Sequence, residues 1–158
     1  MNLRYWGCLI VACTTLVTAP ATAQLIVADD LAAAAAEART QRVPVLVAFM
    51  QQSCPYCAVA RRDYLTVLQN DPRWKNRVLI REIETDRSLA LRDFSGAATT
   101  HREFARAQEV RQVPTIIAFD ADGRRVSPPI IGLLGDDFYR LYLEQAIEAG
   151  LTKMQRIR

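Results

Sequence analysis

Two cysteines separated by two residues are the side chains best suited to chemistry in this chain. Cys54 and Cys57 enclose Pro55 and Tyr56, and they follow the apolar run 43–50. Thiol–disulfide exchange needs a thiolate that attacks a disulfide and a second thiol nearby that resolves the mixed disulfide. The spacing meets both needs, so the sequence predicts a redox-active dithiol in which Cys54 is the nucleophile and Cys57 the resolving thiol.

The segment after the first cysteine has the composition of a helix, which would place Cys54 at a helix start. The free amides and the helix dipole at such a start favour a sulfur anion. Pro55 has the φ angle of a first helical turn and loses no hydrogen bond there. We expect Tyr56 to flank the exposed sulfur and to shape the surface that a substrate contacts.

Metal binding is the first alternative for this cysteine pair. A structural zinc site needs four ligands, and Cys54, Cys57 and the lone histidine, His101, supply at most three nitrogen or sulfur donors. Two thiolates can also hold Cu(I), but no Met-rich or His-rich segment accompanies them. We therefore expect no metal and no cofactor apart from the Cys54–Cys57 disulfide itself. A copper carrier or chaperone and a non-catalytic binding module stay open as alternatives.

Residues 1–23 have the features of a secretory signal peptide. Arg4 gives a positive start, residues 6–17 are largely apolar, and Ala21-Thr22-Ala23 has the form of a signal peptidase site. The apolar stretch is shorter than the roughly 20 residues that a membrane-spanning helix needs. We expect cleavage after Ala23, with lipid anchoring at Cys13 as the alternative. The mature protein would then keep only the cysteines of the C-x-x-C pair.

The rest of the sequence indicates one α/β domain over residues 24–158. The chain has 158 residues, 51% of them hydrophobic, which suffices for one core but not for two ordinary domains. The net charge of +3 is small and the basic residues are scattered, so we expect no nucleic-acid partner. Strands are predicted over 43–50, 77–84, 115–119, 91–94 and 124–126, and helices over 29–39, 58–69, 101–108 and 136–149, with Gly150 as the stop of the last helix. Two helices have an apolar face: Ala60, Tyr64, Val67 and Leu68 in the helix 58–69, and Phe138, Leu141, Tyr142, Leu143 and Ile147 in the last helix. Alternating strands and helices of this kind indicate a mixed sheet flanked by helices.

Three pieces of sequence resemble the thioredoxin fold. They are the strand–Ser53-Cys54-Pro55-Tyr56-Cys57–helix unit, the Val113-Pro114-Thr115 triplet, and an ending with the turn Asp120-Ala121-Asp122-Gly123, a hairpin and a terminal helix. The resemblance implies a central mixed sheet of four to five strands flanked by helices. It also implies a cis bond before Pro114, a substrate-docking loop at Val113 and Pro114, and a Thr115 that lies against the dithiol. The simpler alternatives are a trans proline that starts a strand and a Thr115 that is an ordinary strand residue.

Within that superfamily the chain looks most like exported bacterial thioredoxin-like proteins, including those associated with sulfur-oxidation systems. We therefore expect a periplasmic, monomeric thiol–disulfide oxidoreductase that reduces a partner protein and is itself reduced by a membrane-bound thiol donor. Oxidase and isomerase roles stay open as alternatives. The chain departs from thioredoxins proper at Ser53, which replaces a tryptophan, and at Ala48, which replaces a buried aspartate. Its Cys-Pro-Tyr-Cys tetrad is the one typical of glutaredoxins, but the second half of the chain has no convincing glutathione-binding set.

Three further charged residues, Glu82, Glu84 and Arg61, are candidates for helping the dithiol. Glu82 or Glu84 can substitute for the acid missing at Ala48, although a solvent-facing position at the strand end is the simpler interpretation. Arg61 lies four residues after Cys57 on the predicted helix, where it can favour a thiolate, be solvated or be paired. We predict that His101 is a surface residue in a first helical turn, with no catalytic role.

Overall fold

The fold is built on a four-stranded mixed sheet with strand order β2-β1-β5-β6. The computed structural model describes residues 24–156, and the predicted signal peptide, with Cys13, lies outside the described residues. The strands are β1 (Val45–Met50), β2 (Leu79–Glu84), β5 (Thr115–Phe119) and β6 (Ile130–Ile131). β2 runs parallel to β1, whereas β5 is antiparallel to both β1 and β6. The predicted mixed sheet is thereby confirmed.

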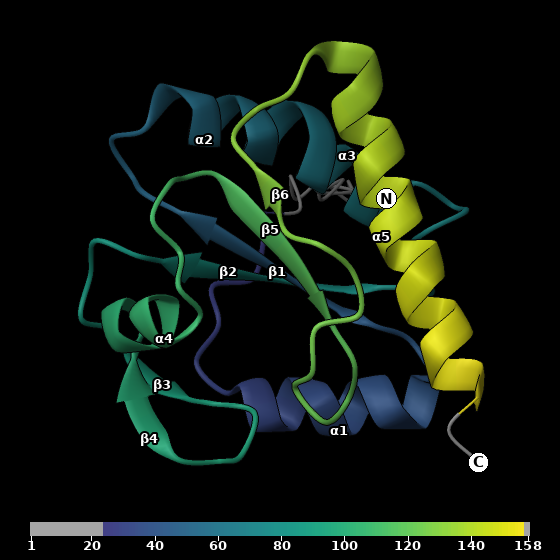
Figure 1. The fold of residues 1–158 in the computed structure, drawn as a ribbon, viewed down its shortest axis with the longest axis horizontal. Helices are drawn as coiled ribbons and strands as arrows, with labels where there is room; N and C mark the ends of the chain where they lie inside the picture. The colour runs from purple at the N-terminus through teal and green to yellow at the C-terminus, as the bar shows by residue number, and fades with distance from the viewer. Residues whose placement is uncertain (1–23, 157–158) are drawn as a thin grey trace, which may run out of the picture.

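Helices cover both faces of the sheet (Figure 1). One face carries α1 (Leu31–Gln41) and α4 (His101–Ala107). The other carries α5 (Asp136–Arg156) and a continuous helical segment made of α2 (Pro55–Val59), the π-helical η1 (Ala60–Leu65) and α3 (Thr66–Asn70). No helix within residues 24–156 is both long and apolar enough to span a bilayer.

β1 lies at the centre of both cores. Its six residues are fully buried. Leu46, Ala48 and Met50 belong to the core beneath α2–α3 and α5, whereas Val45, Val47 and Phe49 belong to the core beneath α1 and α4. This alternation follows from the two-residue period of a strand. A continuous apolar run is therefore what a strand covered on both faces requires.

Three further extended segments complete the strand structure. Residues 26–28 lie along the outer edge of β2, where the Glu82 amide donates to the Ile26 carbonyl at 2.8 Å and the Ala28 amide donates to the Glu82 carbonyl at 2.9 Å. β3 (Ala90–Arg92) and β4 (Ala98–Thr100) form a separate antiparallel hairpin. The strand expected over 91–94 therefore exists, but it pairs with β4 rather than with the main sheet.

The helix starts follow the sequence signals. Asp30 caps α1, because its Oδ1 accepts from the Ala33 amide at 2.7 Å. The predicted capping box of α4 is present, with Thr100 and Glu103 each accepting a backbone hydrogen bond from the other. These side chains occupy amides that the first helical turn leaves free.

Two expectations about strands and helix ends are wrong. The partner of β5 is β6 at residues 130–131 rather than residues 124–126, where Arg125 makes only an isolated bridge to Phe119. Gly150 does not end α5, which continues to Arg156. Gly150 is instead required by packing, since a Cβ there would lie 2.5 Å from the Cβ of Pro44. Gly150 therefore allows α5 to pack closely against Pro44 and does not terminate the helix.

The faces of two helices also differ from their predicted periodicity. Val67 is 47% exposed and Leu65 is buried in its place. The π turn at residues 60–65 accounts for this shift, because it inserts one residue into the helical repeat. On α5, the predicted apolar positions Phe138, Leu141 and Tyr142 are exposed, and Tyr139 is buried with Leu143 and Ile147.

Candidate active site

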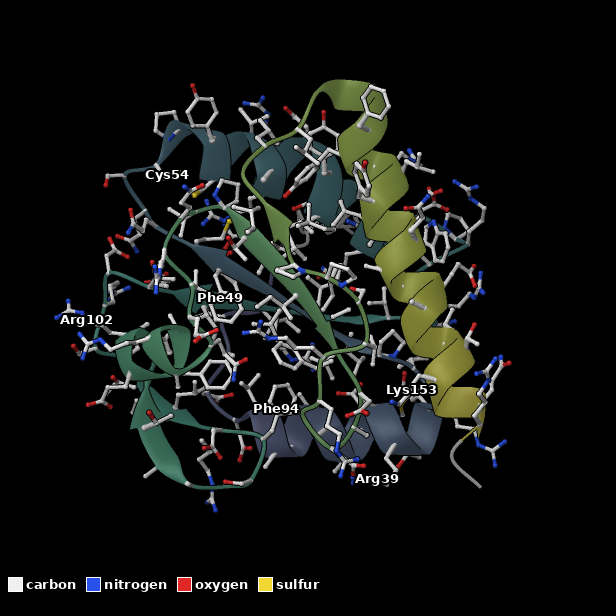
Figure 2. All side chains as sticks on the ribbon, in the orientation of Figure 1. Arg39, Phe49, Cys54, Phe94, Arg102 and Lys153 are labelled. Carbon is white, nitrogen blue, oxygen red and sulfur yellow. The ribbon has the colours of Figure 1, made fainter. Side chains whose placement is uncertain are left out.

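The two cysteines lie where β1 passes into α2, and their sulfurs differ in exposure. Cys54 is half-buried at the N-cap of α2, and Cys57 is fully buried in the core beneath the helix. Figure 2 shows Cys54 at the start of α2, at the edge of the molecule. The amide of Cys57 donates a hydrogen bond to Cys54 Sγ at 3.2 Å. Both side chains are free thiols. Cys54 therefore carries the accessible sulfur of the pair, and Cys57 carries the sheltered one.

Burial keeps the second sulfur protonated. Desolvation, and then the hydrogen bond to Cys54, raise the pKa of Cys57 from its ordinary 9.0 to about 12. A backbone hydrogen bond from Gln51 and the positive charge of Arg61 act in the opposite direction and offset part of this increase. Cys57 is thus a thiol at neutral pH.

The predicted docking loop faces the accessible sulfur. The Val113–Pro114 bond is cis, as expected, and Cys54 Sγ lies 4.0 Å from the Val113 carbonyl oxygen. Thr115 is buried at the start of β5, and its hydroxyl donates to the Gln112 carbonyl at 2.8 Å. This hydroxyl is therefore directed at the loop itself, which agrees with the simpler interpretation of Thr115 as a strand residue.

The two residues between the cysteines take the predicted positions. Pro55 is the first residue of α2, and Tyr56 is 66% exposed. A proline at this position loses no helical hydrogen bond. Tyr56 is one of the more exposed large side chains of the described chain and is available for contact with a bound molecule.

The expectation that Glu82 faces solvent is wrong. Glu82 lies on β2 directly opposite Ala48 in the parallel register, and it is 3% exposed. Arg61 reaches it from the π turn with two hydrogen bonds, one of them from Nε to Oε2 at 2.9 Å. Arg61 is therefore paired rather than solvated. A carboxylate thus lies across from the position where thioredoxins carry their buried aspartate, and it comes from the neighbouring strand.

Glu84 and His101 also differ from their surface assignments. Glu84 is 7% exposed and accepts from Arg87 at 2.7 Å. His101 is fully buried, although it lies in the first turn of α4 as predicted. Its Nδ1 accepts from the Glu84 amide at 2.9 Å, and its Nε2 lies 2.7 Å from the Ala28 carbonyl, to which it donates. The histidine is therefore a buried link between β2 and the N-terminal segment.

Tyr139 is the residue near the site that the sequence reasoning missed. Its ring is fully buried and packs edge-on against Tyr64, with ring centroids 4.8 Å apart. Its hydroxyl has no hydrogen-bond partner within the described residues. Burial first, and then the charge of Cys57, raise the pKa of Tyr139 above its ordinary value. The helical spacing of Tyr139 with Leu143 was the sequence signal for this inward position.

Metal-binding geometry is not evident around the dithiol. Within residues 24–156, no group of three or more His, Cys, Asp or Glu side chains is arranged to hold a metal ion. The pair of sulfurs, one capped by an amide and one buried, is instead an arrangement consistent with thiol–disulfide exchange.

A C-x-x-C pair between a central strand and a helix, facing a cis-proline, is the arrangement of the thioredoxin-like class. The chain belongs to the family described as Thioredoxin-like domain, whose model matches residues 31–147. No curated protein matches the chain.

Solved structures agree on the fold. The structure is similar to thioredoxin O2 from Arabidopsis thaliana in the oxidized state, with a TM-score of 0.53 and 17% identity over 79% of this chain and 92% of that one. It is also similar to a thioredoxin-fold protein from Helicobacter pylori (TM-score 0.55, 19% identity, 74% of both chains) and to Fasciola hepatica thioredoxin (0.54, 16%, 78% and 97%). The α/β thioredoxin-like fold is therefore established.

The difference between the two sulfurs predicts selective alkylation. At pH 7, iodoacetamide should label Cys54 and leave Cys57 largely unmodified, because burial both shields Cys57 and keeps it protonated. As the pH rises toward 12, Cys57 loses its proton and its labelling should increase. Peptide mapping by mass spectrometry measures both sites, and the Cys54→Ser variant isolates the second. Equal labelling of the two cysteines at pH 7 would contradict this assignment.

The Arg61–Glu82 pair predicts an unequal effect of its two truncations. Arg61→Ala leaves a carboxylate that is only 4% exposed without its partner, and we expect it to lower the free energy of unfolding by roughly 3 kcal/mol. Glu82→Ala should cost less, because the Arg61 side chain is 31% exposed and can turn toward water. Urea denaturation measures both losses.

The adjacent Arg62 provides the matched control. It pairs with Asp63 and is 73% exposed, so Arg62→Ala should change the stability little. Similar losses for Arg61→Ala and Arg62→Ala would show that the buried pair is not a special contributor.

Proposed function

We propose that this protein is an exported thiol–disulfide oxidoreductase that reduces a disulfide of a partner protein. The observation that carries the proposal is the asymmetry of the dithiol. Cys54 is accessible and accepts an amide hydrogen bond, whereas Cys57 is buried, protonated and one helical turn away. An exchange reaction needs such a division between an attacking sulfur and a resolving sulfur.

The reaction proceeds in two displacements. The Cys54 thiolate attacks one sulfur of the partner's disulfide, which forms a mixed disulfide and releases the partner's other sulfur as a thiolate that takes up a proton. Cys57 then gives up its proton and attacks Cys54 Sγ. This second step forms the Cys54–Cys57 disulfide and releases the partner's remaining thiol. The partner gains two electrons and two protons, and the dithiol loses them.

The surrounding residues assist both displacements. The Cys57 amide stabilises negative charge on Cys54 in the first. In the second, the positive charge of Arg61 favours the Cys57 thiolate, and Glu82 holds that guanidinium beneath the helix. We assign the substrate-docking role to the backbone of Val113, next to Pro114, because its carbonyl lies beside Cys54 Sγ. Pro55 and Tyr56 complete the contact surface.

The proposal includes export, which the signal-peptide features of residues 1–23 support. Cleavage after Ala23 would leave the whole of the described fold, from Gln24 on, in the mature protein. We place this mature protein in the periplasm as a monomer, with a membrane-bound thiol donor that returns the disulfide to the dithiol. The intact mass of the exported protein tests this placement, since a product that still contains residues 1–23 would contradict it.

The two cysteines should have separable roles in exchange. Cys54→Ser should abolish reduction of a protein disulfide such as that of insulin, because the attacking sulfur is lost. Cys57→Ser should allow the first displacement and trap the mixed disulfide, which non-reducing electrophoresis detects. An active Cys54→Ser protein would refute the proposal. Stoichiometric Cu(I) binding by a wild-type protein without exchange activity would favour a copper carrier or binding module instead.

The reduction potential of the Cys54–Cys57 pair should be that of a reductant. We expect a value near the thioredoxin value of about −270 mV, measured by equilibration with glutathione or dithiothreitol buffers and quantified by mass spectrometry. The Cys57→Ser variant, which cannot form the internal disulfide, is the control. A value near about −120 mV, as in DsbA, would reverse the direction and indicate an oxidant.

A further inference from the structure

A polar cavity lies beside the docking loop. It has a volume of about 490 Å³ and extends from Gln51, which precedes the dithiol, to the C-terminal half of α4. Gln112 and Val113 form its border toward Cys54. Figure 2 shows Cys54 and Arg102 on the same side of the molecule, at α2 and α4 respectively. A molecule bound at Val113 is therefore at the entrance of this cavity.

The lining of the cavity is strongly cationic. Arg102, Arg106 and Arg111 contribute three guanidinium groups, against a single carboxylate from Glu109. The side chains of Arg106 and Arg111 make no hydrogen bond or ion pair with any described residue. Arg102 donates only to the backbone carbonyl of Asp86, which leaves its charge uncompensated. Most other arginines of the described residues have a carboxylate partner, as Arg61 and Arg87 do.

The loop that follows α4 and carries Arg111 is held in place. Arg125 donates to the Gln108 carbonyl, and the Val110 amide donates to the Ala105 carbonyl at 3.0 Å. On the other side of the loop, a second cavity of about 360 Å³ is also lined by Arg111, together with Arg125. A bound chain that crosses the loop at Gln112 would therefore encounter positive charge on both sides.

We propose that this cationic cavity, lined by Arg102, Arg106 and Arg111, is a subsite for acidic side chains that flank the target cysteine of a protein substrate. The inference rests on the proposed exchange function and adds its substrate class. An extended peptide segment that pairs with the Val113 backbone places its neighbouring side chains over the cavity. Asp or Glu at these positions would meet unpaired guanidinium groups, whereas Lys or Arg would be repelled. Such complementarity acts mainly on encounter and substrate discrimination.

The test uses the mature protein and three disulfide-bonded peptides of one scaffold. In these peptides the residues that flank the cysteines are Asp and Glu, Asn and Gln, or Lys. At low salt we expect a kcat/KM for the acidic peptide about tenfold above that for the Lys peptide, with the difference shrinking as salt screens the charges. The double variant Arg106→Gln/Arg111→Gln should lose most of this preference while its rate with the Asn and Gln peptide stays unchanged.

The matched control is the double variant Arg73→Gln/Arg124→Gln, which removes two exposed arginines that do not line the cavity. It should retain the preference. If it loses the preference equally, net charge rather than the cavity is responsible, and the inference is overturned.

Two small disulfides separate the possible failures. Uncharged bis(2-hydroxyethyl) disulfide reports exchange itself, so no reaction with it refutes the proposed function. Normal reaction with it, combined with equal rates for the acidic and Lys peptides, overturns the subsite alone. Oxidised glutathione carries carboxylates without a protein segment. If its reduction depends on Arg106 and Arg111 while the peptide rates do not differ, the cavity is a small-molecule site and the assignment to a protein substrate is overturned.

Discussion

The burial of β1 on both faces is the constraint on which the rest of the structure depends. All six of its residues are removed from water, and both of its edges are paired, to β2 and to β5. A strand held in this way is a rigid base for whatever follows it. The cysteine motif begins four residues after its last residue, so the direction in which Cys54 emerges is set by the most firmly held part of the chain.

Glu82, Glu84 and His101 are tolerated next to this apolar strand because each has a specific partner. Glu82 is held by Arg61, Glu84 by Arg87, and His101 by two backbone groups. A buried charge without a partner would cost several kcal/mol. Together these contacts connect β2, the helix that starts at the dithiol and the N-terminal segment. The environment of the sheltered sulfur therefore depends on residues that are distant from it in sequence.

Local signals in the sequence were sufficient for most elements and for the position of the dithiol. The apolar run of β1, the Asp30 cap and the capping box of α4 each depend on a few neighbouring residues, and the structure has all three. Arg61 pairs with Glu82 across 21 positions of the sequence, and His101 contacts Ala28 across 73 positions. Composition and periodicity report only on neighbouring residues, so they could not predict either contact.

Two wrong predictions, for Val67 and Gly150, arose from helix geometry instead. The π turn of η1 changes the phase of the helix, so a 3.6-residue period placed Val67 inside when it is outside. Gly150 was interpreted from its usual place after a helix end. It lies inside α5 because Pro44, more than a hundred positions earlier, leaves no space for a side chain.

The two edges of the main sheet bear on how this protein behaves at high concentration. An unpaired strand edge is a template on which a second chain can add, and long exposed edges promote aggregation. Here residues 26–28 occupy the outer side of β2, and β6, at the other edge, has only two residues and follows Pro128 and Pro129. The backbone of β2 at Glu82 is therefore closed to strand addition, and β6 is too short to offer a long template at the other edge.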